Sequence, residues 1–277
     1  MLDHGTMTRL RFYAGLGLVT AATLMLQIIE TRIVSVTSWY HLAFFVISVA
    51  MFGLTIGAVY VYLRSASLTP DRLTYHLTLA TLAFALTTAL AILVQLTLVT
   101  GASPSLVAFT AWLELAICLS VPFFFSGVVV SLALTRSPYP IGRVYGVDLV
   151  GAAAGCLGVL ALLNVTSGPG AMLWVSVLIA LAALFFAGSG LGNIPEPNSF
   201  GARLVHRRWI ILASLAALAF ANELTIYGAR PHTVKDRFEH PENLSYDRWN
   251  SFSRITVAPS YQGPAAMWAP SPRMPRF

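Results

Sequence analysis

Seven long apolar runs dominate this 277-residue chain and leave it few ways to fold. A helix that crosses a bilayer needs about 20 consecutive, mostly apolar residues. Charged or Pro- and Gly-rich segments separate the runs, which cover residues 12–30, 42–63, 74–99, 106–134, 145–164, 171–190 and 209–227. The sequence therefore predicts an all-α membrane protein, a polytopic bundle of about seven transmembrane helices.

Charge is scarce and unevenly distributed. The chain is 57% hydrophobic and 10% charged, whereas soluble domains carry about 25% charged residues. This composition excludes a soluble globular protein and a disordered one. Of the 28 charged residues, 15 lie in residues 10–227 and 11 in residues 228–277. We therefore expect a multi-pass transmembrane domain over 1–227 and a short, mostly irregular soluble tail over 228–277.

The basic residues predict an orientation. Cytoplasmic loops of membrane proteins are enriched in Lys and Arg. One side of the seven-span scheme receives only Arg32, and the other receives nine arginines: Arg9, Arg11, Arg64, Arg72, Arg136, Arg143, Arg203, Arg207 and Arg208. We expect a plasma-membrane protein with a cytoplasmic amino terminus. Seven spans would place the tail outside, and six or eight would place it inside. Because most basic residues flank spans, the net charge of +6 indicates a lipid bilayer as partner and no nucleic acid.

Four ionisable residues inside the spans are candidates for a substrate-binding pocket, because such groups are costly in a membrane. Glu30, Arg32 and Glu114 all fall towards the outer third of the predicted bundle, where Arg32 could pair with either glutamate. Alternatively, Glu30 and Arg32 only mark a helix end, and Glu114 is the one deep charge. The fourth candidate, Asp148, lies in the first turns of its helix, where the dipole or an ion pair with Arg136 or Arg143 would stabilise it.

Small residues at helical spacing predict close helix packing. Gly53 and Gly57 share one face of the second run, and Gly151 and Gly155 share one face of the fifth. The six histidines show no spacing typical of metal ligands. The sequence predicts no catalytic residue, no metal site and no cofactor in this chain.

Hydrophobic periodicity stops after Tyr227. Residues 246–257 read as a short strand, and the Pro- and Gly-rich stretch from Ala258 to Pro275 is loop-like. A single strand does not fold alone, so the tail resembles the start of a domain.

Several segments resemble one known family, the membrane-anchored spermidine synthase-like proteins. The most specific are Trp249-Asn-Ser-Phe-Ser-Arg254 followed by Met267-Trp-Ala-Pro-Ser-Pro-Arg-Met274, and Tyr145-Gly-Val-Asp-Leu-Val-Gly-Ala-Ala-Ala-Gly-Cys156. Glu30-Thr-Arg32 and Phe123-Phe-Phe-Ser-Gly127 also resemble that family's membrane domain. The resemblance covers most of the chain from Gly15 to Arg273.

In that family the bundle precedes a Rossmann-like domain that binds S-adenosylmethionine, or its decarboxylated form, through a glycine-rich turn. No such turn follows Trp249 in this chain. The resemblance implies a truncated or split member of the family, with no catalysis of its own. Its bundle would anchor a synthase domain, supply that domain with substrate, or contact other membrane subunits. A cytoplasmic cofactor would require a cytoplasmic tail, which conflicts with seven spans. Two alternatives stay open: a transporter- or permease-like module for a small, cationic solute, and a purely structural membrane subunit.

Overall fold

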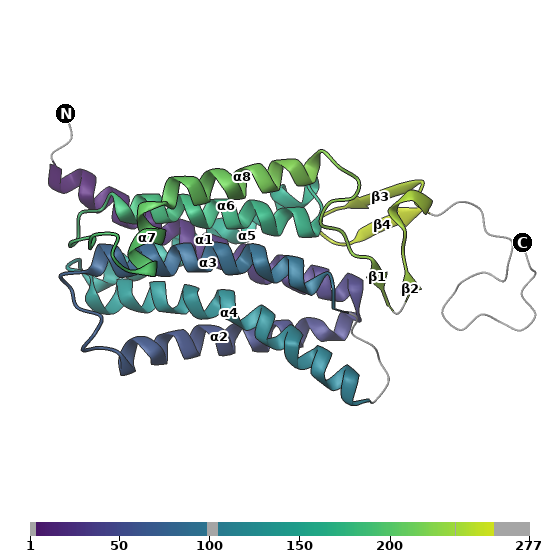
Figure 1. The fold of residues 1–277 in the computed structure, drawn as a ribbon, viewed down its shortest axis with the longest axis horizontal. Coiled ribbons are helices and arrows are strands. Elements are labelled where there is room, and N and C mark those ends of the chain that lie inside the picture. Colours follow the sequence, from purple (N-terminus) through teal and green to yellow (C-terminus); the bar gives the residue numbers. More distant parts are fainter. Residues whose placement is uncertain (1–3, 99–104, 236, 258–277) are drawn as a thin grey trace, which may run out of the picture.

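A 34-residue helix, α1 (His4–Thr37), runs the length of the bundle, and four of the other long helices pack against it (Figure 1). The computed structural model describes residues 4–98, 105–235 and 237–257. The helices that follow are α2 (Ala43–Leu63), α3 (Leu73–Gln95), α4 (Leu106–Arg136), α5 (Ile141–Val165), α6 (Gly168–Ala187), α7 (Phe200–His206) and α8 (Arg208–Glu223), with a short 3₁₀ turn at Tyr40–Leu42 before α2. The predicted all-α helical bundle with a short C-terminal tail is confirmed.

Six of these helices, α1 to α6, are long and apolar enough to cross a membrane, so the chain is a multi-pass membrane protein. The seventh predicted span is not one straight helix. Within residues 209–227 the helix α8 ends at Glu223, and α7, which precedes it, meets it at a bend of 69°. Alone, the 16 residues of α8 span about 24 Å, less than the roughly 30 Å of a bilayer core.

The first helix is longer than predicted. We expected a span over 12–30 that Glu30 and Arg32 close, but α1 continues to Thr37. Ile33 and Val34 are buried in the bundle and extend its apolar face. Glu30 and Arg32 therefore lie within the helix rather than marking its end.

Helices α1, α3 and α6 form the centre of the bundle, and α2 and α5 lie at its periphery. About 61% of the most apolar stretch is buried in each central helix, against 28% for α2 and 22% for α5. The outer faces of these two helices are nevertheless apolar, with exposed side chains such as Phe52 and Ile56 on α2 and Val150 and Leu157 on α5. These faces suit contact with lipid.

Glycines permit the closest helix contacts. A Cβ at Gly53 or Gly57 would overlap the backbone of α4 near Ser120 and Phe124. On α5, Gly151 and Gly155 lie in the same way against the backbone of α1. All four glycines therefore lie at helix–helix contacts, α2 with α4 and α5 with α1.

The two ends of the bundle differ in charge. Successive helices run in opposite directions, so the amino terminus and the carboxyl-terminal strands lie at opposite ends (Figure 1). The nine arginines that flank the helices lie at the end that holds the amino terminus, which we name the arginine end. Some of them close helix ends: Arg11 donates to the carbonyl of Gly188 at 2.9 Å, and Arg136 to that of Ser65 at 3.2 Å. The opposite end, which carries the strands, is named the tail end.

The tail forms two antiparallel hairpins, β1 (Thr233–Val234) with β2 (Arg237–Phe238), and β3 (Tyr246–Trp249) with β4 (Arg254–Val257). The prediction of one strand over 246–257 is wrong, because the chain turns at Asn250. The Asn250 side chain accepts hydrogen bonds from the backbone N–H groups of Phe252 and Ser253, at 2.8 and 2.7 Å. A 3₁₀ turn, η2 (Pro241–Asn243), joins the hairpins. The second part of the family resemblance, Met267 to Met274, lies outside the described residues.

Candidate functional sites in the bundle

The structure does not bring Glu30, Arg32 and Glu114 into one pocket. Glu30 is 1% exposed inside the bundle, whereas Glu114 is exposed on the outer side of α4. Arg32 donates to the carbonyl of Phe252 in the tail at 3.3 Å. In the described part of the chain, no ion pair joins Arg32 to either glutamate. The interpretation of Glu114 as the one deep charge is also wrong, because α4 turns that side chain outward.

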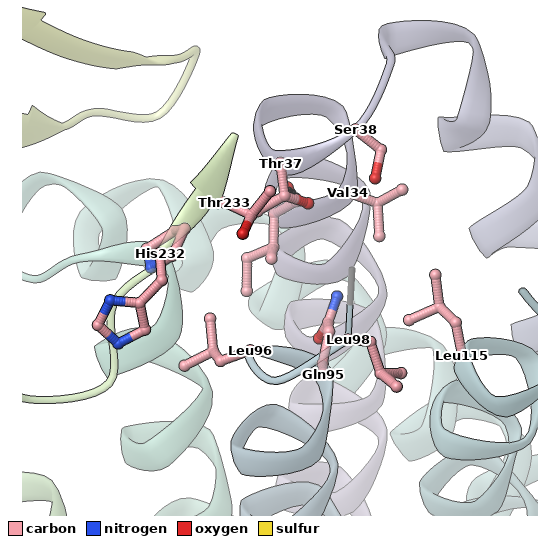
Figure 2. Close-up of a pocket in the computed structure, with 11 residues that line it drawn as sticks. Val34, Thr37, Ser38, Gln95, Leu96, Leu98, Leu115, His232 and Thr233 are labelled. Carbon is pink, nitrogen blue, oxygen red and sulfur yellow. Dashed lines mark hydrogen bonds between the residues drawn. The ribbon is translucent and has the colours of Figure 1, made fainter. Parts of the chain in front are cut away.

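A small chamber of about 30 Å³ lies at the tail end, next to Glu30. Ile33 and Val34, one turn beyond Glu30 on α1, line it together with Gln95, the last residue of α3. Figure 2 shows the Gln95 amide near the middle of the chamber, between side chains of α1 and Leu115 of α4. A volume of this size holds about two water molecules.

The polar groups of the chamber are poorly satisfied. Gln95 is 8% exposed, and neither its amide nitrogen nor its oxygen has a hydrogen-bond partner among the described residues. Glu30 Oε2 is equally unpaired. The two side chains lie next to each other without a hydrogen bond of ordinary geometry. Water in the chamber would satisfy the Gln95 amide.

Residues of the tail cover this chamber. Pro231, His232 and Thr233 also line it, and Figure 2 shows His232 and Thr233 on the β1 side. The N–H of Lys235 donates to the carbonyl of Thr37 at 2.7 Å. The polar end of the bundle core is therefore covered by the segment that leads into β1.

Replacing Glu30 by glutamine is expected to leave the melting temperature at least as high as that of the wild type. A buried, unpaired carboxylate destabilises a fold by several kcal/mol when ionised, and the amide keeps its size without its charge. Thermal unfolding in detergent micelles measures this, with the exposed Glu114→Gln as matched control. A fall of about 6 °C, equivalent to ~2 kcal/mol, would contradict it and would show that the carboxylate stabilises the bundle.

A second site is a groove of about 400 Å³ between the helices α1, α2, α4 and α5. Its polar lining comes from Asp148 of α5 and from five hydroxyl side chains on α1 and α4, which are Thr20, Thr23, Ser126, Ser131 and Thr135. Thr23 and Ser126 hydrogen-bond to each other across the helices at 2.6 Å. We name this cavity the Asp148 groove.

Asp148 is half-buried and makes no hydrogen bond or ion pair to any described residue. The suggested ion pair with Arg136 or Arg143 is absent, because Arg136 instead donates to Ser65. Asp148 also lies beyond the first turn of α5, which begins at Ile141, so the helix dipole acts on it only weakly. The carboxylate is thus left free in the groove.

The tail docks on the tail end through Trp249. This side chain is 7% exposed, and it lies over Gly168 at the start of α6, where a Cβ would come within 2.8 Å of the indole ring. Beside it is a polar pocket of about 400 Å³ lined by residues of α5, α8 and β3, including Glu223 and Arg248. Within it the Thr166 hydroxyl donates to the Glu223 carboxylate.

Arg254 holds the second hairpin together. Its guanidinium binds both carboxylate oxygens of Asp247 at 2.8 and 2.9 Å and Glu239 at 2.7 Å. Burial alone would lower the pKa of Arg254, but the two carboxylates raise it above its usual value. Arg230 adds a longer pairing to Asp247 at 3.7 Å.

Replacing Arg254 by lysine is expected to accelerate hydrogen exchange of the hairpin about fivefold. Lysine keeps the charge but loses the forked geometry that binds a carboxylate through two bonds, a loss of ~1 kcal/mol. The amide of Ser245, which donates to the Val257 carbonyl at 2.8 Å, reports it. Arg248→Lys, an exposed position in the same hairpin, is the control, and equal rates in both variants would contradict the role of Arg254.

Sequence reasoning missed Gln95 and the hydroxyl side chains of the groove. Each is an uncharged polar residue within an apolar run, where only ionisable residues stand out by their cost in a membrane. Thr and Ser are common in transmembrane helices because they can donate to the carbonyl four residues earlier, as Thr23 does to Val19 at 2.8 Å. Gln95 carries the stronger signal, because an amide has no such partner in its own helix.

Comparisons with protein-family models, with curated proteins and with solved structures find no match for this chain. Among residues 4–98, 105–235 and 237–257, no group of three His, Cys, Asp or Glu side chains lies close enough to hold a metal ion. The Asp148 groove and the docked tail are therefore the features from which a function can be argued.

Proposed function

We propose that this chain is the integral membrane domain of a spermidine synthase-like protein, and that its bundle fixes the start of a soluble synthase-like domain at the tail end. The observation that carries the proposal is the docking of Trp249 over Gly168. Trp249 begins the segment of the tail that resembles the family, and the same segment turns the chain from β3 into β4.

The hairpins also have other attachments to the bundle. Arg32 of α1 donates to the Phe252 carbonyl in the β3–β4 turn, and the Asn222 side chain at the end of α8 accepts from the N–H of Ala229 at 2.6 Å. Because these contacts come from different helices, they fix the orientation of the tail on the bundle as well as its attachment. A domain that continues from β4 would thus be held at a fixed angle to the membrane.

The arginine end is proposed to face the cytoplasm of a plasma-membrane protein, which places the tail end outside. A synthase-like domain there would need its nucleoside cofactor outside the cytoplasm. Anchoring is therefore the part of the proposal that the bundle supports best, and substrate supply to such a domain is the weaker part.

The reading frame beyond the Phe277 codon tests the synthase part. We expect a glycine-rich strand-to-helix turn, followed by acidic residues that suit a ribose and an amine. A frame that continues without such a turn, or an intact gene that stops at Phe277, would contradict it.

A second candidate function is a permease-like module for a small solute. The Asp148 groove favours it, because it places an unpaired carboxylate at membrane depth between two pairs of packed helices. Uptake of a labelled amine into proteoliposomes that falls on Asp148→Asn would support this function, and uptake equal to that of protein-free liposomes would contradict it.

A further inference from the structure

The Asp148 groove combines one uncompensated negative charge with apolar walls. Asp148 is its sole ionisable lining residue among those described, and Leu54, Val130, Leu134 and Ala152 contribute alkyl surface. An unpaired carboxylate in this region of a membrane protein is costly. A ligand that carries a positive charge would remove that cost, so charge complementarity selects a cation.

The lining does not suit calcium or magnesium on coordination grounds. Calcium and magnesium require about six or more oxygen ligands, usually with several carboxylates or waters. The groove offers one carboxylate, and its other polar side chains are neutral hydroxyls that supply no further negative charge. Thr23 and Ser126 bind each other, and Thr135 donates to the Ser131 carbonyl at 2.7 Å, so these hydroxyls are already held by contacts within the bundle. An ammonium ion needs fewer oxygen partners, and Asp148 can provide the charged one.

The shape of the groove favours a linear ligand. Its α4 lining extends from Ser126 to Thr135, nine residues that rise about 14 Å along a helix. Its volume of about 400 Å³ lies within the range of small-molecule sites, about 300–1,000 Å³. An alkyl chain would contact the leucine and alanine side chains, and a charged group would lie at Asp148.

We propose that the Asp148 groove binds a linear aliphatic primary ammonium ion from solution, with the ammonium group on Asp148 and the alkyl chain along α4. The proposal rests on the second candidate function and names its ligand class. An aminophospholipid fits less well, since its phosphate follows the ammonium closely and the described lining has no Arg, Lys or His to receive it.

Thermal unfolding of the full chain in detergent micelles tests binding directly, because a ligand of the folded state raises the melting temperature in a saturable way. The probe is n-butylammonium at neutral pH, with 1-butanol as the uncharged analogue. We expect a saturable rise of several degrees with n-butylammonium and none with 1-butanol. Asp148→Asn should abolish the rise, and Glu114→Gln, a carboxylate outside the groove, should retain it.

A second variant covers the case in which Asp148→Asn does not fold. Ala152→Leu keeps the carboxylate but fills part of the groove, and it should also lose the rise. An unchanged melting temperature in the wild type, or an equal rise in Asp148→Asn, overturns the proposal. A rise with phosphatidylethanolamine in mixed micelles but none with n-butylammonium overturns it in favour of a lipid.

The outcomes separate binding from transport. Binding of n-butylammonium without uptake into proteoliposomes supports the site and contradicts the permease-like function. Loss of binding, with the tail still docked, overturns the site and leaves the anchoring function intact.

Discussion

Replacing Trp249 by alanine will release the tail from the bundle and leave the bundle folded. Trp249 is 7% exposed and is the aromatic side chain of β3 that packs over Gly168. Truncating a buried tryptophan to alanine costs about 3–5 kcal/mol. Most of this cost should reduce the free energy of docking the tail on the bundle. Since each ~1.4 kcal/mol is a factor of ten, the population with an undocked tail rises at least about a hundredfold.

Limited trypsin digestion and hydrogen exchange measure the release. The amide of Lys235, which donates to the Thr37 carbonyl at 2.7 Å, should exchange about a hundredfold faster in Trp249→Ala. Cleavage after the basic residues of the tail should accelerate in parallel.

The matched control is Phe252→Ala, which removes an aromatic side chain from the turn of the same hairpin. Phe252 is 78% exposed, so we expect its loss to change neither rate by more than about twofold. Equal protection in Trp249→Ala and the wild type would show that the tail does not depend on this contact. The anchoring proposal would then lose its main support.

Replacing Gly155 by leucine will disrupt the bundle. A Cβ at Gly155 would overlap the backbone of α1 at Ala21, and a backbone cannot move aside as a side chain can. Overpacking costs about 1–3 kcal/mol and occasionally more, and a clash with backbone lies at the upper end, about 3 kcal/mol. At roughly 2–4 °C per kcal/mol, the melting temperature should fall by about 6–12 °C, as measured by thermal unfolding in detergent.

Gly146→Leu on the same helix is the control. No atom lies within 4 Å of a Cβ placed at Gly146, so the identical change in chemistry meets open space. We expect a shift of less than about 2 °C there, corresponding to ~0.5 kcal/mol. Similar shifts in the two variants would mean that α5 is not packed on α1 through this face.

The spans were predictable because apolar length is a strong signal. The ends of the spans were less predictable. The charged side chains of Glu30 and Arg32 suggested that the first helix ends there, but it continues to Thr37. The bend between α7 and α8 also lacks a clear signal, because Arg207 and Arg208 read equally well as a flank of one straight helix. Apolar pattern therefore locates the long apolar helices better than it gives their ends and bends.

The candidate sites were only partly predictable. Glu30 and Glu114 look alike in sequence, since each is a single acidic residue in an apolar run. The rotation of each helix decides which one is buried, and a helix that is apolar on all sides carries no pattern that fixes its rotation. The packing of α4 on α2 and α3 turns Glu114 outward, and α1 places Glu30 inside.

The turn within the tail does have a local sequence signal. Asn250 and Ser253 are typical turn residues, and they interrupt residues 246–257 at its middle. Pairing of β3 with β4 follows from that turn, whereas docking on the bundle depends on the glycine at 168 that makes room for Trp249.

Labelling of single cysteines from one side of the membrane tests the central claim, that the bundle crosses the bilayer and holds the tail opposite the arginine end. In a Cys118→Ala, Cys156→Ala background, Ser67→Cys reports the arginine end and Ser245→Cys the tail end, both at exposed positions. With a membrane-impermeant maleimide, we predict that intact cells label Ser245→Cys and that Ser67→Cys is labelled only after lysis. The reverse pattern would invert the orientation but keep the two ends apart. Labelling of both positions from the same side would contradict the account.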